Sequence, residues 1–231
     1  MLSRIAAAVV PSLGHLTTTS DEEAAPVTGS IVVANHTSLV DPGIVLAALL
    51  RHGVEPVVLA TAGLWRIPVL RPLLVRGGHV PVHRGSVRAA ESLDEAATAL
   101  RAGRHVLIYA EGRLPPRKDS AEAAPEPFRS GLARLALAAD APVLPLGQAG
   151  ARRVVSGGTV KQIAGLLTAP ARRPRLHVHL GAPVRLPGDI PAATAAAHRA
   201  VTAAWRTAAA HLAREVPGGG AVRRGAAPHT R

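Results

Sequence analysis

A histidine and an aspartate near the start of the chain have the types needed for acid–base chemistry. His36 and Asp41 are five residues apart, which is about 500° of rotation in one helix and would point their side chains well away from each other. On one strand they would lie on opposite faces. A turn between a strand and a helix removes this restriction and lets the carboxylate fold back onto the imidazole. The carboxylate would then fix the tautomer of His36 and leave the other ring nitrogen as a base for a hydroxyl group.

The same residues also have a purely structural interpretation. Asp41 directly precedes Pro42 and is a good N-cap for a helix that begins there, and residues 35–38 are ordinary turn formers. A single histidine in such a segment is more often a turn residue than a base. Spacing alone therefore slightly favours a structural role of His36 and Asp41 over a catalytic one, and the other motifs of the chain are needed to choose between them.

Buried strands are predicted immediately before the two most polar motifs. The apolar run at residues 30–34 predicts a strand that leads into His36, and a helix is expected from Pro42 until Gly53. A second strand, predicted at residues 105–110, ends at the motif Glu111-Gly112-Arg113. Ligands of parallel sheets collect at the carboxyl ends of the strands. The two motifs are therefore expected to belong to one site.

Strands alternate with helices over most of the chain. This pattern predicts an α/β fold, a mainly parallel sheet with helices on both faces, in a single domain. Further strands are expected at residues 54–60, 79–83, 142–146 and 176–180, and further helices at residues 86–102, 128–139 and 192–214. The predicted organisation is an N-terminal amphipathic or packing segment over residues 1–29, a main domain over residues 30–215 and a disordered basic tail over residues 216–231.

Five short motifs occur between residues 30 and 150. The first, Asn35 to Asp41, has the pattern NHxSxxD. The others are Ile67-Pro68 with Arg76-Gly-Gly-His-Val-Pro-Val-His-Arg84-Gly85 downstream, Tyr109-Ala-Glu111-Gly112-Arg113, Phe128-Arg-Ser-Gly131, and Ala141-Pro-Val-Leu-Pro145-Leu. In type and order they resemble the motifs of the glycerolipid acyltransferases, the family of 1-acyl-sn-glycerol-3-phosphate acyltransferase. Five motifs in the right order are a far more specific signal than one.

The resemblance implies an enzyme, an acyltransferase, and a role for each motif. In this family the histidine removes the proton from the acceptor hydroxyl, which attacks an acyl thioester, while the aspartate orients the histidine; this implies that His36 and Asp41 are catalytic. Arginine suits a phosphate because its guanidinium can donate two parallel hydrogen bonds. The resemblance assigns substrate-binding roles to Arg84 and Arg113, which would hold the acceptor's phosphate, and to Glu111 and Gly112, which would shape the site.

The substrates expected from the resemblance are a lysophospholipid acceptor, in the first place 1-acyl-sn-glycerol-3-phosphate, and an acyl-coenzyme A or acyl carrier protein donor. The expected process is phospholipid biosynthesis. No cofactor is expected besides the donor as co-substrate. No metal is expected either, because beyond His177 and His179 the remaining histidines show no ligand spacing. The absence of cysteine excludes disulfides, thiolate nucleophiles and cysteine-ligated zinc.

The third motif departs from the family pattern. It usually reads Pro-Glu-Gly-Thr-Arg, whereas here Ala110 replaces the proline and Arg113 directly follows Gly112. Some branches, such as bacterial lysophosphatidylethanolamine acyltransferases, also have Glu-Gly-Arg. The alternative acceptors are therefore lysophosphatidylethanolamine and a lyso-ornithine lipid.

The formal net charge of +12 rests almost wholly on arginine, since Lys118 and Lys161 are the only lysines. Such a charge suits nucleic acid, an anionic membrane or a phosphorylated acceptor, although a GC-rich coding sequence gives the same bias whatever the function. Aromatic residues, at 2%, are few and scattered, which argues against stacking on nucleic acid. No nucleic-acid partner is therefore expected. A non-catalytic basic protein that binds lipid or nucleic acid remains the alternative from another class, and the presence of both His36 and Asp41 argues against it.

The chain has no run of about 20 apolar residues such as a membrane-spanning helix needs. The segment from Leu64 to Val75 instead mixes large apolar residues with arginines and reads as a surface segment with an apolar and a cationic face. We expect a cytoplasmic protein that associates peripherally with an anionic membrane face.

Overall fold

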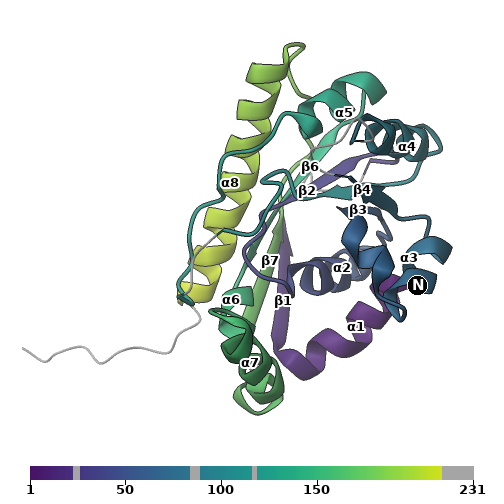
Figure 1. Cartoon of the computed structure of the whole chain (residues 1–231). Coiled ribbons are helices and arrows are strands. Elements are labelled where there is room, and N and C mark those ends of the chain that lie inside the picture. Colours follow the sequence, from purple (N-terminus) through teal and green to yellow (C-terminus); the bar gives the residue numbers. More distant parts are fainter. Residues whose placement is uncertain (23–26, 84–88, 116–118, 215–231) are drawn as a thin grey trace, which may run out of the picture.

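The computed structural model describes residues 1–22, 27–83, 89–115 and 119–214. Within these residues, seven strands form a single sheet: β1 His15–Ser20, β2 Ile31–Ala34, β3 Val57–Thr61, β4 Val80–Val82, β5 Val106–Ile108, β6 Val143–Ala149 and β7 Arg175–Leu180. Their order across the sheet is β1-β7-β6-β2-β5-β3-β4 (Figure 1). The five strands from β6 to β4 are parallel to one another, whereas β7 pairs antiparallel with β6 and β1 runs parallel to β7. The prediction of a mainly parallel sheet is confirmed.

Helices cover both faces of this sheet. They are α1 Leu2–Leu13, α2 Asp41–Arg51, α3 Leu70–Arg76, α4 Ala89–Arg101, α5 Gly131–Ala139, α6 Ala151–Val154, α7 Thr159–Arg172 and α8 Ile190–Arg214, with a 3₁₀ turn, η1, at Ala62–Arg66. The long helix α8 lies along one face, together with α4 and α5, while α1 and α2 lie on the other (Figure 1). Within the described ranges, no helix is both long enough and apolar enough to cross a membrane.

Strand β2 shows why its sequence is apolar at every position. Ile31 and Val33 pack in the core formed with α4, α5 and α8, whereas Val32 and Ala34 pack in the core formed with α1 and α2. All four side chains are fully buried, because successive residues of a strand point to opposite faces and both faces are covered by helices. β2 lies at the centre of the sheet, between β6 and β5.

Strand β1 was not predicted, although it belongs to the sheet. Its sequence, His15 to Ser20, carries polar residues at nearly every position and has no apolar run to indicate a strand. The threonines are instead satisfied across the sheet: Thr17 and Thr19 pair with the ring nitrogens of His177 at 2.7 and 2.9 Å. An edge strand that is held by polar pairing with a distant segment gives no local hydrophobic signal.

The segment between β6 and β7 was also left without prediction, and it contains α6 and α7. Helix α7 contains both Gly165 and Pro170, residues that usually mark the end of a helix rather than its interior. The tail predicted over residues 216–231 lies outside the described residues, as does Ser86, the first residue of the helix predicted over residues 86–102.

Candidate active site

The segment from Asn35 to Asp41, here called the catalytic turn, connects β2 to α2. His36 Nδ1 lies 3.0 Å from Asp41 Oδ2, so the carboxylate has folded back onto the imidazole as the spacing suggested. The same oxygen accepts hydrogen bonds from the backbone N–H groups of Thr37 and Ser38. Asp41 is fully buried. One carboxylate therefore fixes both the path of the turn and the orientation of the histidine.

Asp41 does not cap α2, which was the structural alternative. Asp41 is the first residue of the helix, and the N-cap position belongs to Val40. The carboxylate accepts hydrogen bonds from the turn that precedes the helix and from His36. Its second oxygen, Oδ1, is buried and has no partner in the part of the chain that the structure describes. The negative charge is thus directed at the turn and the imidazole.

The second nitrogen of the His36 ring is free. Nδ1 faces Asp41, and Nε2 forms no hydrogen bond with the described residues. The side chain of His36 is 15% exposed, and its ring packs on Tyr109 with 4.4 Å between the ring centroids. A ring that is held on one side by a carboxylate and on its flank by an aromatic side chain presents Nε2 as a positioned proton acceptor.

Glu111 connects the third motif to the catalytic turn. Its Oε1 accepts a hydrogen bond of 2.7 Å from the backbone N–H of His36, and its Oε2 accepts one of 3.2 Å from the N–H of Glu126. The side chain is almost completely buried. Burial raises the pKa of Glu111 to about 7, against the opposing effect of the two backbone hydrogen bonds. Glu111 therefore holds the backbone of the histidine, and its charge changes near neutral pH.

We expect Glu111→Gln to alter the pH dependence of folding stability. In the unfolded chain a glutamate ionises near pH 4.5, whereas in the folded protein Glu111 ionises only near pH 7. The folded state therefore holds the additional proton between these values, and Glu111 should cost the wild type about 3 kcal/mol of stability as pH rises from 4.5 to 7. Glutamine cannot ionise and should remove this dependence.

Chemical denaturation of both proteins at several pH values measures this effect. Burial lowers the pKa of His79 to about 4, so His79 contributes a slope of opposite sign in both proteins. The difference between wild type and variant isolates Glu111. A difference that stays constant from pH 4.5 to 7.5 would show that the pKa of Glu111 is the same in the folded and unfolded states.

Gly112 has the backbone conformation that favours glycine, with φ of +73°. A Cβ atom at this position would lie 2.7 Å from Arg129 Cδ, so the absence of a side chain lets Arg129 lie across the motif. Arg113 follows as an exposed residue that makes no hydrogen bond or ion pair with the described residues. Of the six predicted site residues, the structure thus brings His36, Asp41 and Glu111 into direct contact and places Gly112 and Arg113 next to them; Arg84 lies outside the described residues.

Two polar residues on the side of β6, Gln148 and Arg152, hold the catalytic turn together with Asn35 of the turn itself, and none of the three was assigned a role from sequence. The side-chain amide of Asn35 donates to the backbone oxygen of Gln148 and accepts from its backbone N–H, at 3.0 and 2.8 Å. The amide of Gln148 donates to Thr37 Oγ1 at 3.1 Å, and Arg152 donates to the carbonyl of Thr37 at 3.1 Å. The predicted strand stopped at residue 146, whereas β6 continues to Ala149. A strand predicted as far as Ala149 would have placed Gln148 at its carboxyl end, where a role in the site could have been expected.

Comparisons with known proteins identify the family and the fold of the chain. A family model described as Acyltransferase matches residues 15–148, more than half of the chain. A search of curated proteins finds no significant match. Among solved structures, the chain is similar to the crystal structure of the 1-acyl-sn-glycerophosphate (LPA) acyltransferase PlsC from Thermotoga maritima, with a TM-score of 0.68, 19% identity, and coverage of 92% of this chain and 79% of that one. At that identity the likeness shows the shared fold. The matched residues run from β1 to the end of β6 and include the whole His36–Asp41–Glu111 cluster, and the chain belongs to the acyltransferase family.

Proposed function

We propose that this acyltransferase moves a fatty acyl chain from an acyl thioester to the free hydroxyl of a lysophospholipid, with 1-acyl-sn-glycerol-3-phosphate as the acceptor, in phospholipid biosynthesis. The observation that carries the proposal is the contact of 3.0 Å between His36 Nδ1 and Asp41 Oδ2 at the carboxyl end of the central strand. A histidine base oriented by a buried carboxylate is suited to deprotonating a hydroxyl group. Among the described residues no serine forms a hydrogen bond with the His36 ring, which fits a hydroxyl supplied by the substrate.

The proposed reaction needs one proton transfer in each direction. His36 Nε2 accepts the proton of the acceptor hydroxyl as the oxygen attacks the thioester carbonyl carbon. The positive charge that forms on the imidazole is stabilised by Asp41. When the tetrahedral intermediate collapses, the carbon–sulfur bond breaks, and the imidazolium returns its proton to the leaving thiolate. The products are the new ester and the free thiol of coenzyme A or of acyl carrier protein.

The choice of acceptor rests on the arginines and on the related structure. Arg113 is exposed beside the catalytic turn and forms no polar contact with the described residues, so its guanidinium is available to a phosphate. The structural relative from Thermotoga maritima is named as an acyltransferase for 1-acyl-sn-glycerophosphate, and this supports the same acceptor here. Arg84 is proposed as the second phosphate ligand by its place in the family motif.

A panel of lysolipids tests the acceptor directly. The purified protein is given labelled acyl-coenzyme A or acyl carrier protein and one acceptor at a time, and products are identified by mass. We expect the highest turnover with 1-acyl-sn-glycerol-3-phosphate. Higher turnover with lysophosphatidylethanolamine or a lyso-ornithine lipid would replace this acceptor by another. Binding of lysolipids without any transfer would instead support the non-catalytic alternative.

We predict that Arg113→Lys raises the KM for the lysolipid about tenfold with a smaller effect on kcat. Lysine keeps the charge but cannot donate two parallel hydrogen bonds to a phosphate. Arg84→Lys should behave in the same way. Acceptor saturation is measured at fixed donor concentration, with Arg101→Lys on α4 as the matched control, since Arg101 is exposed and its hydrogen bond within the described residues goes to Thr98 of its own helix. Unchanged saturation in both variants would place the phosphate elsewhere.

We further propose that the protein acts at the cytoplasmic face of an anionic membrane and docks through the segment from Leu64 to Val75. In this segment Ile67, Val69 and Val75 are exposed, although they are large aliphatic residues. Arginines alternate with them, and no acidic residue occurs between Glu55 and Glu91. An apolar surface edged by arginines matches the chemistry of a bilayer that contains anionic lipids.

Val69→Asp should weaken binding to anionic vesicles by about tenfold or more. Val69 is 75% exposed, so the change should leave the fold intact, but it removes apolar contact and adds a negative charge at the membrane surface. Leu167→Asp is a matched control on α7, where the side chain is 74% exposed. Vesicle sedimentation at two salt concentrations measures both. A larger loss in Leu167→Asp would move the docking surface to α7.

A further inference from the structure

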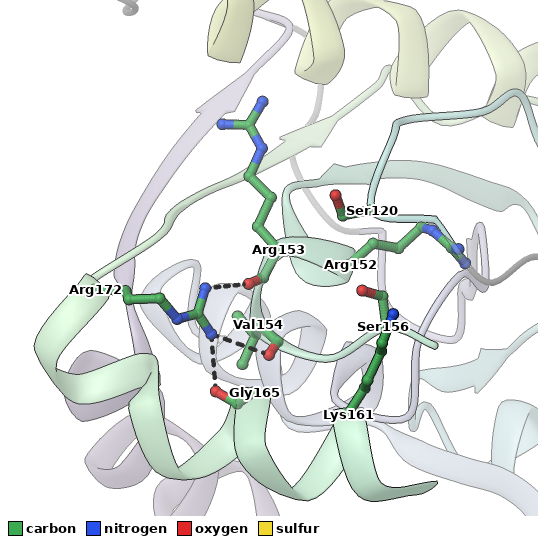
Figure 2. A pocket seen from close by; sticks show the side chains of 8 residues that line it. All are labelled: Ser120, Arg152, Arg153, Val154, Ser156, Lys161, Gly165 and Arg172. Atoms are coloured by element: carbon green, nitrogen blue, oxygen red, sulfur yellow. Dashed lines mark hydrogen bonds between the residues drawn. The ribbon is translucent and has the colours of Figure 1, made fainter. Parts of the chain in front are cut away.

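A basic pocket lies beside the catalytic turn, on the side of β6. Its cavity of about 320 Å³ is formed by the start of α6, one side of α7 and the loop at residue 120. The residues that line it are Ser120, Arg152, Arg153, Val154, Ser156, Lys161, Gly165 and Arg172 (Figure 2). We call this set the α6–α7 pocket.

The pocket shares a wall with the catalytic turn. Arg152, which is buried, donates to the carbonyl of Thr37, the residue next to His36, at 3.1 Å. Ser38 Oγ donates to the carbonyl of Val155 at 2.9 Å. These two contacts join α6 and the residues after it directly to the turn that holds the proposed base, so a group bound in the pocket would lie next to the reaction site.

The charge of the pocket is strongly one-sided. Four of the residues that line it are cationic and none is acidic. The whole stretch of sequence between Asp140 and Asp189 contains no acidic residue. The carboxylate of Glu122 interacts with Arg153: burial raises the pKa of Glu122, and the N–H of Gly150 and the charge of Arg153 act in the opposite direction. Cationic groups gathered around a cavity without carboxylates repel one another and favour an anion.

The cations differ in what they are free to bind. Arg172 donates to the carbonyls of Arg153 and Gly165 at 2.7 and 2.8 Å, and Arg152 donates to carbonyls of the turn and of Asp119, so both are committed to the backbone (Figure 2). In Figure 2 the side chain of Arg153 extends away from Lys161. The side chain of Lys161 instead extends from α7 toward Ser156.

Lys161 Nζ and the hydroxyls of Ser120 and Ser156 form no hydrogen bond with the described residues, although all three line the cavity. An ammonium group and two hydroxyls, backed by two fixed guanidinium groups, form a set of donors suited to the oxygens of a phosphate.

We propose that the α6–α7 pocket binds a phosphate group of one of the two substrates, with Lys161 as its principal ligand. This inference rests on the proposed function only for the identity of the two substrates. Arg113 is not among the residues that line the pocket, which follows β6 except for Ser120. The pocket is thus a second phosphate site, separate from the one assigned to Arg113. A coenzyme A or phosphopantetheine carrier supplies phosphates on the donor, and a lysophospholipid supplies one on its headgroup.

Calorimetry with unreactive phosphates tests binding without catalysis. Adenosine 3′,5′-bisphosphate, glycerol 3-phosphate and inorganic phosphate serve as probes. We expect at least one of them to bind the wild type with an affinity that falls as salt rises, and Lys161→Gln to weaken that binding about tenfold. Lys161→Arg should retain it. Arg134→Gln is the matched control, because it removes one exposed charge from α5, a helix that does not line the pocket.

Kinetics distinguish the two sources. If the pocket holds the donor's phosphate, Lys161→Gln raises the KM for acyl-coenzyme A and leaves acceptor saturation unchanged; if it holds the headgroup, the effect is reversed. The proposal is overturned if no probe binds the wild type, or if Lys161→Gln binds every probe as the wild type does. Repeating the calorimetry with His36→Ala separates the phosphate site from the proposed acyl transfer. His36→Ala should still bind the probes, because the pocket does not need the base. Phosphate binding that depends on Lys161 would therefore stand even if the acyl-transfer activity were not found.

Discussion

Replacing His36 by alanine should lower the rate of acyl transfer by about 10² to 10⁴ and leave the fold intact. The loss is that of a positioned general base, which contributes a factor of this size. The fold should persist because the His36 side chain has one hydrogen bond, to Asp41, and the bond from its backbone N–H to Glu111 does not depend on the side chain. The ring is not part of either hydrophobic core cluster.

Initial rates at saturating donor and acceptor measure this effect, and circular dichroism with thermal unfolding shows whether the variant is folded. His15→Ala is a suitable control, since His15 is an exposed histidine on the edge strand β1. The control should retain the wild-type rate. A folded His36→Ala protein that transfers acyl chains at nearly that rate would remove His36 from the mechanism.

The local parts of the site could be predicted from sequence, and the reasons are physical. The apolar run before His36 has the composition of a strand covered on both faces, and Pro42 suits the first turn of a helix, so both elements that hold the catalytic turn are encoded next to it. The five-residue spacing of His36 and Asp41 allows contact only across a turn, and the structure has that contact.

The distant parts of the site could not be predicted in the same way. Glu111 contacts the backbone of His36 across 75 residues, and Arg152 contacts the turn across 115. Neither contact leaves a periodic pattern, because each depends on which strands become neighbours in the sheet. The family resemblance placed Glu111 in the site, but its link to the His36 backbone is a contact that only the fold supplies. Its pKa near 7 follows from burial, against the opposing effect of its two N–H donors.

The edge strand β1 and the helices α6 and α7 were missed for a related reason. The threonines of β1 are satisfied by histidines about 160 residues away in β7, and α7 exposes most of its side chains, so neither element shows a clear hydrophobic period. The helices α6 and α7 also provide most of the residues that line the α6–α7 pocket. The segment between β6 and β7, whose sequence predicted no helix, is therefore where the structure reveals a candidate site that the sequence did not indicate.

Asp41→Asn should distinguish a catalytic role of Asp41, in which it acts on His36, from a purely structural role in the turn. In the wild type, Oδ2 accepts three N–H groups, from His36, Thr37 and Ser38, while Oδ1 is buried without a partner in the described part of the chain. The asparagine oxygen can take the place of Oδ2 and keep the turn. Its amide group would then occupy the place of Oδ1, where the lack of an acceptor should cost about 1–3 kcal/mol of stability.

The catalytic effect of Asp41→Asn should be far larger than this loss of stability suggests. A neutral amide cannot stabilise the imidazolium that forms on His36, and the corresponding change in a Ser-His-Asp triad lowers kcat by about 10⁴. We expect a loss of about 10² to 10⁴ per folded molecule, measured below the unfolding temperature of the variant, with Asp94→Asn on α4 as an exposed control that should change neither rate nor stability. If the carboxylate only shapes the turn, Asp41→Asn would lower the unfolding temperature and leave the rate per folded molecule near that of the wild type. A large loss of rate in a folded protein, by contrast, requires the charge of Asp41 to act on His36 during the reaction.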